Sequence, residues 1–490
     1  MSYLELLNLA SPEAIVVVTA LVVLSIGLAS ERAATLCAFV AVLGLAVATG
    51  AVLMLPRNAT LFGGMLVITP LTSLFKIICI VLALFTVLLT TSENSLRHRG
   101  EYVAIILLAT VGLMLLVGSE ELLMIFIGLE LLGLSLYVMA AFNKSDVRSA
   151  EAGLKYFLFG STSSAFTLFG ISLIYGMSGA TGLAAISEKL ATGFPTSSGL
   201  LAIGVVMTLV GFSFKIAAAP FHLWAPDAYQ GAPVPSAAFI ASGSKVASFV
   251  VLGKIVLVGF APVHGSAAWH GMVAGWSPLL AILAAFSILL GNLVALAQSN
   301  VRRLLAYSAV AHGGYTLIGL VAGGRDGFSA ALFYTTTYAI TLVGAFGVVG
   351  FVRRETGGDD LSNFSGLCSR SPLLAGCMAI FMLSLAGIPP LAGFFGKFYL
   401  FSAALHAGPS HGLLWLVALA LLGSFISLYY YLMVLKFIFV DKRAKAGADP
   451  QSLITDQVLQ KSTISLLAAA VLLLGVMPDT LAAQILAAMP

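Results

Sequence analysis

The sequence predicts an all-α polytopic membrane protein of about fourteen transmembrane helices, with discontinuous helices at the seventh and twelfth positions. The 490 residues are 60% hydrophobic and only 9% charged, with a mean hydropathy of +1.06, whereas soluble domains are nearer half apolar and a quarter charged. Long apolar segments follow one another with short connections, and basic residues gather in alternate loops. We therefore expect a single membrane domain over residues 1–490.

A membrane-spanning helix needs about 20 predominantly apolar residues, and fourteen segments approach or exceed that length. They cover residues 12–29, 34–55, 67–90, 102–118, 121–142, 152–177, 200–219, 236–260, 276–298, 303–322, 328–352, 372–403, 412–438 and 461–486. Because the connections are short, these helices are expected to pack as one bundle.

The placement of basic residues indicates which loops share a side of the membrane. The odd-numbered loops hold thirteen of them, namely Arg32, Arg97, Arg99, Lys144, Arg148, Arg302, Arg303, Arg353, Arg354, Arg370, Lys442, Arg443 and Lys445. The even-numbered loops hold three, namely Arg57, Lys189 and Arg325. Since basic loops stay in the cytoplasm, both termini are expected on the opposite side of the membrane.

Eight lysines lie within the apolar segments or at their ends. Lys76, Lys436 and Lys461 are close enough to a helix end for the side chain to reach the headgroups. Position alone also favours contact with the headgroups for Lys155. For Lys254, position is equally consistent with contact with the headgroups and with a functional role. The other three buried lysines are Lys215, Lys245 and Lys397.

These three lysines and Glu130 lie deeper in their segments. A charged residue at a helix centre costs about 2.5–3.5 kcal/mol, so four cost on the order of 10 kcal/mol. One acid cannot pair with three bases, and a purely structural ion network is therefore a poor account of them. Such a row is expected to gain and lose protons, as a proton relay requires.

Prolines interrupt two of the segments beside buried lysines. Pro220 follows Lys215 by five positions, and Pro389 and Pro390 precede Lys397. Paired interruptions of this kind indicate a transport site, although simple kinks are an alternative. The breaks are five helices apart, which predicts two inverted five-helix repeats, helices 4–8 in residues 101–260 and helices 9–13 in residues 276–438. Helices 1–3 in residues 1–100 and helix 14 in residues 461–486 lie outside the repeats.

Two histidines accompany the relay. His222 follows the first break, and it either caps carbonyls freed by the break or carries protons. His312 lies in the middle of its helix, and this costly position favours a functional role. The four cysteines, Cys37, Cys79, Cys368 and Cys377, lack metal spacing, and no nucleotide-binding or cluster motif occurs. We expect no cofactor, metal or nucleic acid on this chain, and any redox centre on other chains.

Four stretches point to a family. "KIAAAPFHLWAPDAYQGAPVPSAAFIASGSKVASF" closely resembles the signature of the antiporter-like subunits of respiratory complex I, which are related to Mrp-type cation/proton antiporters. "EAGLKYFLFGSTSSAFTLFGISLIYG", "VRRLLAYSAVAHGGYTLIGL" and "AGIPPLAGFFGKFYLF" resemble the subunit N branch. The resemblance covers about helices 4 to 13 and implies fourteen helices with two inverted repeats.

The resemblance implies a relay of Glu130, Lys155, Lys215, Lys245, Lys397, His222 and His312. Glu130 would pair with Lys215, and Lys155 would modulate that pair. Lys245 would be the central lysine, and Lys397 would lie near the exit. The subunit M branch has an acid where this chain has Lys397, and the subunit L branch has a long lateral helix after its last segment.

The implied function is proton translocation in a translocase, NADH–quinone oxidoreductase. The implied location is a bacterial inner membrane, with both termini on the periplasmic side. The complex as a whole would use NADH, flavin, iron–sulfur clusters and quinone, and this chain would contact subunit M, small membrane subunits and the bilayer. Alternatives are a Na+/H+ antiporter subunit of the Mrp type, a non-pumping membrane scaffold, and a related complex with another electron donor.

Overall fold

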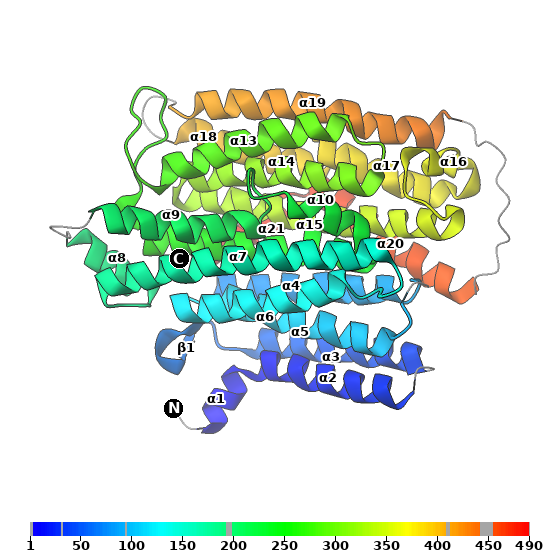
Figure 1. Cartoon of the computed structure of the whole chain (residues 1–490), viewed down its shortest axis with the longest axis horizontal. Helices are drawn as coiled ribbons and strands as arrows, with labels where there is room; N and C mark the ends of the chain where they lie inside the picture. Colours follow the sequence, from blue (N-terminus) through cyan, green and yellow to red (C-terminus); the bar gives the residue numbers. More distant parts are fainter. Residues whose placement is uncertain are drawn as a thin grey trace.

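Apolar helices run side by side along the longest axis of the molecule (Figure 1). The computed structural model describes residues 3–30, 33–93, 96–192, 198–407, 412–441 and 454–489. In these ranges twelve helical runs are long and apolar enough to span a membrane. They are α2 (Ser11–Ala29), α3 (Ala34–Met54), α4 (Pro70–Thr90), α5 (Arg99–Gly118), α6 (Leu122–Ala140), α7 (Val147–Ser178), the run Val234–Gly259, α13 (Trp276–Leu296), α14 (Val301–Ala322), α15 (Gly324–Thr356), α19 (Leu414–Phe439) and α20 (Ile454–Val476).

Both predicted discontinuous segments are broken at their prolines. The first consists of α9 (Ser198–Lys215) and α10 (Trp224–Gly231), with Pro220 in the irregular stretch between them. The second consists of α17 (Pro372–Ala386) and α18 (Ala392–His406), separated by Pro389 and Pro390. The breaks are therefore confirmed, whereas the count of fourteen stays a prediction because α9 and α17 are shorter than a full span.

The eighth segment has an interruption that the sequence analysis did not predict. Instead of one helix over 236–260, the structure has α11 (Val234–Ala241) and α12 (Gly243–Lys254), followed by a π-helical turn, η3 (Ile255–Gly259). Ser242 separates the two helices, and its hydroxyl donates to the Ala238 carbonyl at 2.6 Å. A Ser–Gly pair is a common cause of such kinks, so "ASGSK" was the available signal.

The last predicted segment, 461–486, is also divided. Helix α20 ends at Val476, Pro478 precedes α21 (Asp479–Ala488), and a continuous helix was therefore the wrong expectation. Pro478 cannot donate the backbone hydrogen bond that a continuing helix requires.

Short elements cover the two ends of the bundle. At one end, β1 (Ala59–Leu61) pairs antiparallel with β2 (Leu66–Ile68) in the register Ala59↔Ile68. The remaining short elements are α1 (Tyr3–Leu9), η2 (Phe62–Gly64), α8 (Leu183–Ala191), η4 (Ala261–Val263), η5 (Leu361–Phe364) and α16 (Leu367–Arg370).

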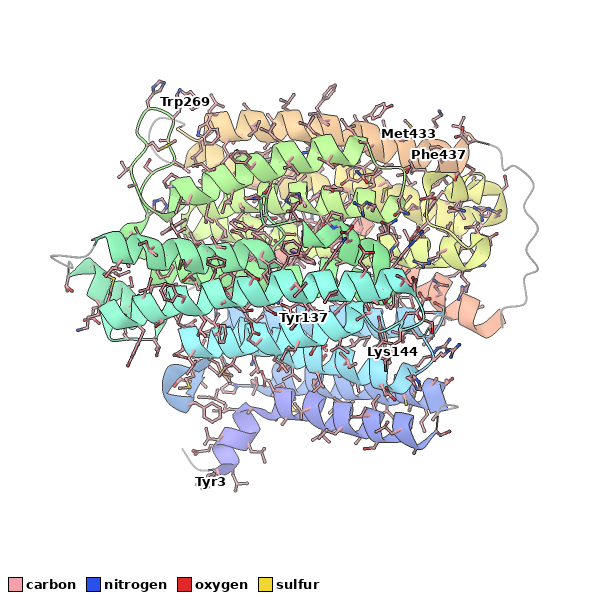
Figure 2. The ribbon with its side chains drawn as sticks, viewed as in Figure 1. Tyr3, Tyr137, Lys144, Trp269, Met433 and Phe437 are labelled. Carbon is pink, nitrogen blue, oxygen red and sulfur yellow. The ribbon has the colours of Figure 1, made fainter. Side chains whose placement is uncertain are left out.

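Two names for the ends of the bundle are used below. The hairpin end carries β1–β2 and the turn at residues 118–121, which pairs with β2 and with Gly182. The basic end carries the loops at 143–147, 297–300 and 357–360, which meet through an Arg353–Asp146 ion pair and an Asn300–Asp360 bridge. Both chain ends lie toward the left of Figure 1, as does β1. Figure 2 places Tyr3 and Trp269 toward that side and Lys144 toward the other.

The centre of the bundle is built from α12, α14 and α15, most of whose side chains are buried. The broken segments lie against this centre, since α10 and α18 both pack on α14. The basic residues Arg32, Lys442, Arg443 and Lys445, which entered the loop count, lie outside the described residues.

Candidate functional site: a buried row of lysines

Glu130 on α6 and Lys215 at the end of α9 line one small cavity. Its volume is about 10 Å3, close to what one water molecule needs. The Ser164 hydroxyl donates to Glu130 Oε1 at 2.5 Å, while Lys215 Nζ lies 5.8 Å from the ring centre of Tyr137. No nitrogen–oxygen contact within 4.0 Å joins Glu130 to Lys215. The pair implied by the resemblance thus shares a cavity without direct contact.

The first break is held by one side chain of its own segment and one from α13. Trp224 Nε1 donates to the Phe214 carbonyl at 3.1 Å, and the Ala219 amide donates to Ser287 Oγ at 2.8 Å. These bonds satisfy backbone groups that would otherwise be unpaired at membrane depth. His222 is buried in the same stretch, and its Nδ1 has no hydrogen-bond partner among the described residues.

Lys245 lies three residues beyond the Ser242 kink and is 2% exposed. Its ammonium donates to the Ala309 carbonyl of α14 at 2.5 Å. It also lies 5.6 Å from the ring centre of Tyr338, within cation–π range. Because both partners are neutral, Lys245 can lose its proton without breaking an ion pair.

Lys397 on α18 uses a carbonyl that the second break sets free. Its ammonium donates to the Ala386 carbonyl at 3.0 Å and to Ser424 Oγ at 2.8 Å. Ala386 is the last residue of α17, where carbonyls lack helical partners. Lys397 Nζ also lies 5.2 Å from the ring centre of Tyr315. The break therefore builds part of the binding site for this ammonium group.

His312 lies on α14 between two tyrosines. Its Nδ1 is 2.6 Å from the Tyr334 hydroxyl, and its Nε2 is 2.9 Å from the Tyr431 hydroxyl. The Tyr431 hydroxyl is also 2.5 Å from Ser308 Oγ. Both ring nitrogens of this buried histidine are thus hydrogen-bonded, and these bonds offset the desolvation cost of burying the ring in the middle of a helix.

Lys155 lies in a different cluster, at the basic end. Its ammonium is 2.7 Å from Asp227 Oδ2 and 2.6 Å from Glu151 Oε1. Arg303 Nη1 is 2.7 Å from Asp227 Oδ1. Although burial raises the pKa of the Asp227 carboxyl, hydrogen bonds from Lys155 and Arg303 outweigh it and hold that pKa below its usual range. Lys155 therefore forms ion pairs with Asp227 and Glu151.

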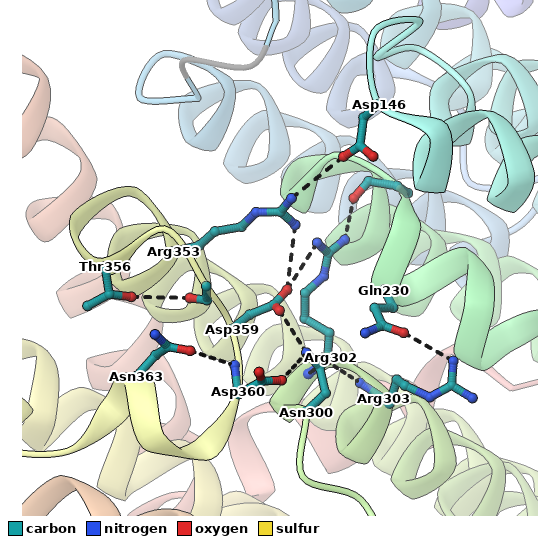
Figure 3. A network of polar contacts seen from close by, with 12 residues as sticks. Asp146, Gln230, Asn300, Arg302, Arg303, Arg353, Thr356, Asp359, Asp360 and Asn363 are labelled. Carbon is teal, nitrogen blue, oxygen red and sulfur yellow. Dashed lines mark hydrogen bonds and ion pairs between the residues drawn. The ribbon is translucent and has the colours of Figure 1, made fainter.

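A network of ion pairs continues from this cluster across the basic end (Figure 3). Fully buried Arg302 bonds to the Ala232 carbonyl and contacts Asp359 Oδ2 at 3.4 Å. Arg353 contacts the same oxygen at 3.5 Å and Asp146 at 3.9 Å. This network joins the stretch after α10 to the ends of α14 and α15, so it fixes the first break relative to the central helices.

Two of the lysines at helix ends do not reach the headgroups. Lys76 is 4% exposed and lies 2.6 Å from Glu13 Oε1. The expectation that its side chain reaches the headgroups was therefore wrong. Lys254 is 6% exposed; it donates to the Val117 carbonyl at 3.0 Å and lies 3.4 Å from Glu120. Lys436 is exposed, whereas Lys461 lies 5.6 Å from the ring centre of Phe351.

The sequence analysis missed the tyrosines and Asp227. Tyr334 and Tyr338 are one turn apart in "YTTTY", and Tyr431 closes the run "YYY", so helical spacing beside a buried histidine was the available signal. Asp227 was part of a quoted motif but received no role. In the described ranges, no group of three or more His, Cys, Asp or Glu side chains is placed to hold a metal ion.

The chain is similar to known membrane proteins over most of its length. The family described as "NADH:quinone oxidoreductase/Mrp antiporter, TM" matches residues 119–427. NADH-quinone oxidoreductase subunit N 2 of Acidobacterium capsulatum is 48% identical, over 98% of each chain. A chain of respiratory complex I from Thermus thermophilus is 31% identical with a TM-score of 0.78, covering 96% of this chain and 98% of that one. A chain of the Mrp complex from Dietzia has a TM-score of 0.85 over 99% of this chain and 97% of its own at 21% identity, which shows the fold alone.

Proposed function

Because the chain belongs to the NADH:quinone oxidoreductase/Mrp antiporter family of transmembrane subunits, we propose that it is a proton-translocating subunit N of a bacterial NADH–quinone oxidoreductase. Electron transfer among NADH, flavin, iron–sulfur clusters and quinone would take place on other chains. This chain would lie in the membrane beside subunit M and small membrane subunits. Its task would be to move protons when those partners shift its buried charges.

The proposed path begins at the cavity shared by Glu130 and Lys215. A rearrangement in neighbouring subunits would change the distance between these two groups. With Glu130 farther away, Lys215 loses a stabilising negative charge and releases its proton. The proton would pass to Lys245 and then to Lys397. The return of Glu130 would favour reloading of Lys215.

We further propose that the basic end faces the cytoplasm and the hairpin end the periplasm. Loops rich in Lys and Arg remain on the cytoplasmic side, and Lys144, Arg302 and Arg353 belong to the basic end. Reloading of Lys215 would then draw protons from the cytoplasm, and Lys397 would release them toward the periplasm.

The observation that carries the proposal is the burial of Lys215, Lys245 and Lys397 without an ion-pair partner among the described residues. Structural ion pairs need opposite charges, whereas proton carriers need to change charge. The test replaces each lysine by Met in the assembled complex and measures proton uptake by inverted vesicles during NADH oxidation. Loss of uptake is expected for each variant, and unchanged uptake would refute the role of that lysine.

Two other functions are distinguished by separate measurements. A Na+/H+ antiporter subunit would give sodium-dependent proton movement without NADH oxidation. A membrane scaffold would make Lys245→Met and Glu130→Gln disturb assembly while leaving the turnover of assembled complexes unchanged. Near-full-length similarity to subunit N relatives favours the proposed function over both.

A further inference from the structure

His312 is placed between Lys245 and Lys397 by its helix. It lies three residues after Ala309, whose carbonyl binds Lys245, and three residues before Tyr315, whose ring lies beneath the ammonium of Lys397. Both of its ring nitrogens bond to tyrosine hydroxyls that are fully buried. A tyrosine hydroxyl both donates and accepts hydrogen bonds, so these three side chains form a continuous hydrogen-bonded series.

Each tyrosine contacts a residue that is next in the chain to one end of the proposed transfer. The Tyr431 hydroxyl bonds to Ser308 Oγ, and Ser308 is the direct neighbour of Ala309, which binds Lys245. The ring of Tyr334 packs against α18 at Gly396, the residue before Lys397, since a Cβ atom on Gly396 would lie 2.5 Å from Tyr334 Cδ2. The series therefore joins the part of α14 that binds Lys245 to the turn of α18 that carries Lys397.

We propose that Tyr431 and Tyr334 are proton-relay residues that carry protons through His312 from Lys245 to Lys397. The inference rests on the proposed function and adds residues to its path. It assigns Tyr431, with Ser308, to the Lys245 side and Tyr334 to the Lys397 side.

The proton balance closes in this arrangement. Neutral His312 carries one N–H, so one ring nitrogen donates to a hydroxyl and the other accepts from one. With Nδ1 protonated, Tyr431 donates to Nε2 and Tyr334 accepts from Nδ1. When a proton reaches the Tyr431 oxygen, Tyr431 passes its own proton to Nε2, and Nδ1 releases its proton to Tyr334. Tyr334 hands its proton on toward Lys397, so one proton enters, one leaves, and both tyrosines end neutral.

The proposed step requires the tyrosine hydroxyl. Replacing Tyr by Phe removes the hydroxyl and keeps the aromatic ring. In Tyr431→Phe and Tyr334→Phe, we expect proton uptake by inverted vesicles during NADH oxidation to fall by about tenfold or more, the scale of a lost proton-transfer group. The residual activity should show a larger solvent isotope effect in D2O. Because both hydroxyls act in one series, the double variant should be no slower than the slower single variant.

The matched control is Tyr229→Phe. Tyr229 is equally buried, but its hydroxyl has no hydrogen-bond partner in the described part of the chain, so uptake and isotope effect should stay at wild-type values. Where Tyr431→Phe does not assemble, Ser308→Ala removes the bond to the same hydroxyl and should slow uptake less than Phe would.

Wild-type uptake in assembled Tyr431→Phe or Tyr334→Phe complexes, while Lys245→Met is inactive, would overturn the relay and leave the proposed function standing. Lower thermal stability with an unchanged isotope effect would show a structural role and would overturn the relay as well. Normal pumping by Lys245→Met would overturn both proposals.

Discussion

The ammonium of Lys155 lies 2.7 Å from Asp227 Oδ2, which ties α7 to α10 at the basic end. Arg303 of α14 binds the other oxygen of that carboxylate at 2.7 Å. Helix α10 follows directly after the irregular stretch that begins after Lys215. The Asp227 carboxylate thus fixes α10, the helix after the first break, between α7 and α14, which belong to the two different predicted repeats.

Replacing Asp227 by Asn is expected to lower proton uptake more than stability. The partners are partly exposed, and each of the two ion pairs contributes about 0–1 kcal/mol, so the free energy of unfolding should fall by at most about 2 kcal/mol. Uptake should fall further, because α10 would no longer be fixed beside the break. Thermal unfolding in detergent and vesicle uptake measure the two effects. Glu151→Gln is the control, since it removes only the more exposed partner of Lys155; equal uptake by both variants would contradict the prediction.

The same carboxylate predicts a contribution to acid sensitivity. Its folded-state pKa is below the usual value because Lys155 and Arg303 outweigh the effect of burial. A depressed pKa adds stability that is complete above the unfolded value of about 3.9 and is lost as the pH falls through the folded value. The difference in stability between wild type and Asp227→Asn should therefore be constant near neutral pH and shrink below about pH 4.

The buried pair Lys76–Glu13 gives a prediction about stability alone. The two charges are 2.6 Å apart and join α4 to α2. Lys76→Met leaves a buried carboxylate unpaired, which costs about 3–5 kcal/mol. Adding Glu13→Gln removes that charge and should restore most of the loss. Thermal unfolding of the two single variants and the double variant measures this, and additive losses would contradict it.

Much of the fold followed from composition and the spacing of apolar residues. Twelve spans and the breaks at Pro220 and Pro389–Pro390 lie where the sequence placed them, since length in lipid and loss of a backbone donor are local properties. The kink at Ser242 and the end of α20 before Pro478 were missed. Both depend on one residue inside a segment that is otherwise apolar enough to be continuous.

The site was predictable by residue type but not by partner. Burial cost alone singled out Lys245 and Lys397, and both are buried. Sequence gives no information on which carbonyl or hydroxyl lies opposite a side chain from another helix. The partners Ala309 and Ser424 were therefore unpredictable, as was the acid that binds Lys76.

Glu130 should matter for its charge and not for packing. It shares a cavity with Lys215 and accepts a hydrogen bond from Ser164. Glu130→Gln keeps the shape and removes the charge, so proton uptake should fall by about tenfold or more while the complex assembles. Glu121→Gln, which caps the same helix through Met124, should leave uptake unchanged and cost at most about 1 kcal/mol. If the two variants pumped equally well, Glu130 would have no role in the relay.

The second break should be sensitive to a single methyl group on a neighbouring helix. Gly475 of α20 packs on the irregular stretch, and a Cβ there would lie 2.1 Å from the Pro390 carbonyl oxygen and 2.7 Å from the Ala392 amide. Because those atoms are backbone, Gly475→Ala should force α20 and the break apart at a cost of about 1–3 kcal/mol. The break supplies the Ala386 carbonyl to Lys397, so proton uptake should fall with stability.

Gly376→Ala on α17 is the control for that variant. A Cβ at Gly376 meets no atom within 4 Å, and Ala in a helix interior is more favourable than Gly by about 0.5–1 kcal/mol. This variant should therefore unfold at the same temperature as wild type or slightly higher, with normal uptake. Equal stability of Gly475→Ala and Gly376→Ala would mean that the contact between α20 and the second break does not determine the geometry around Lys397.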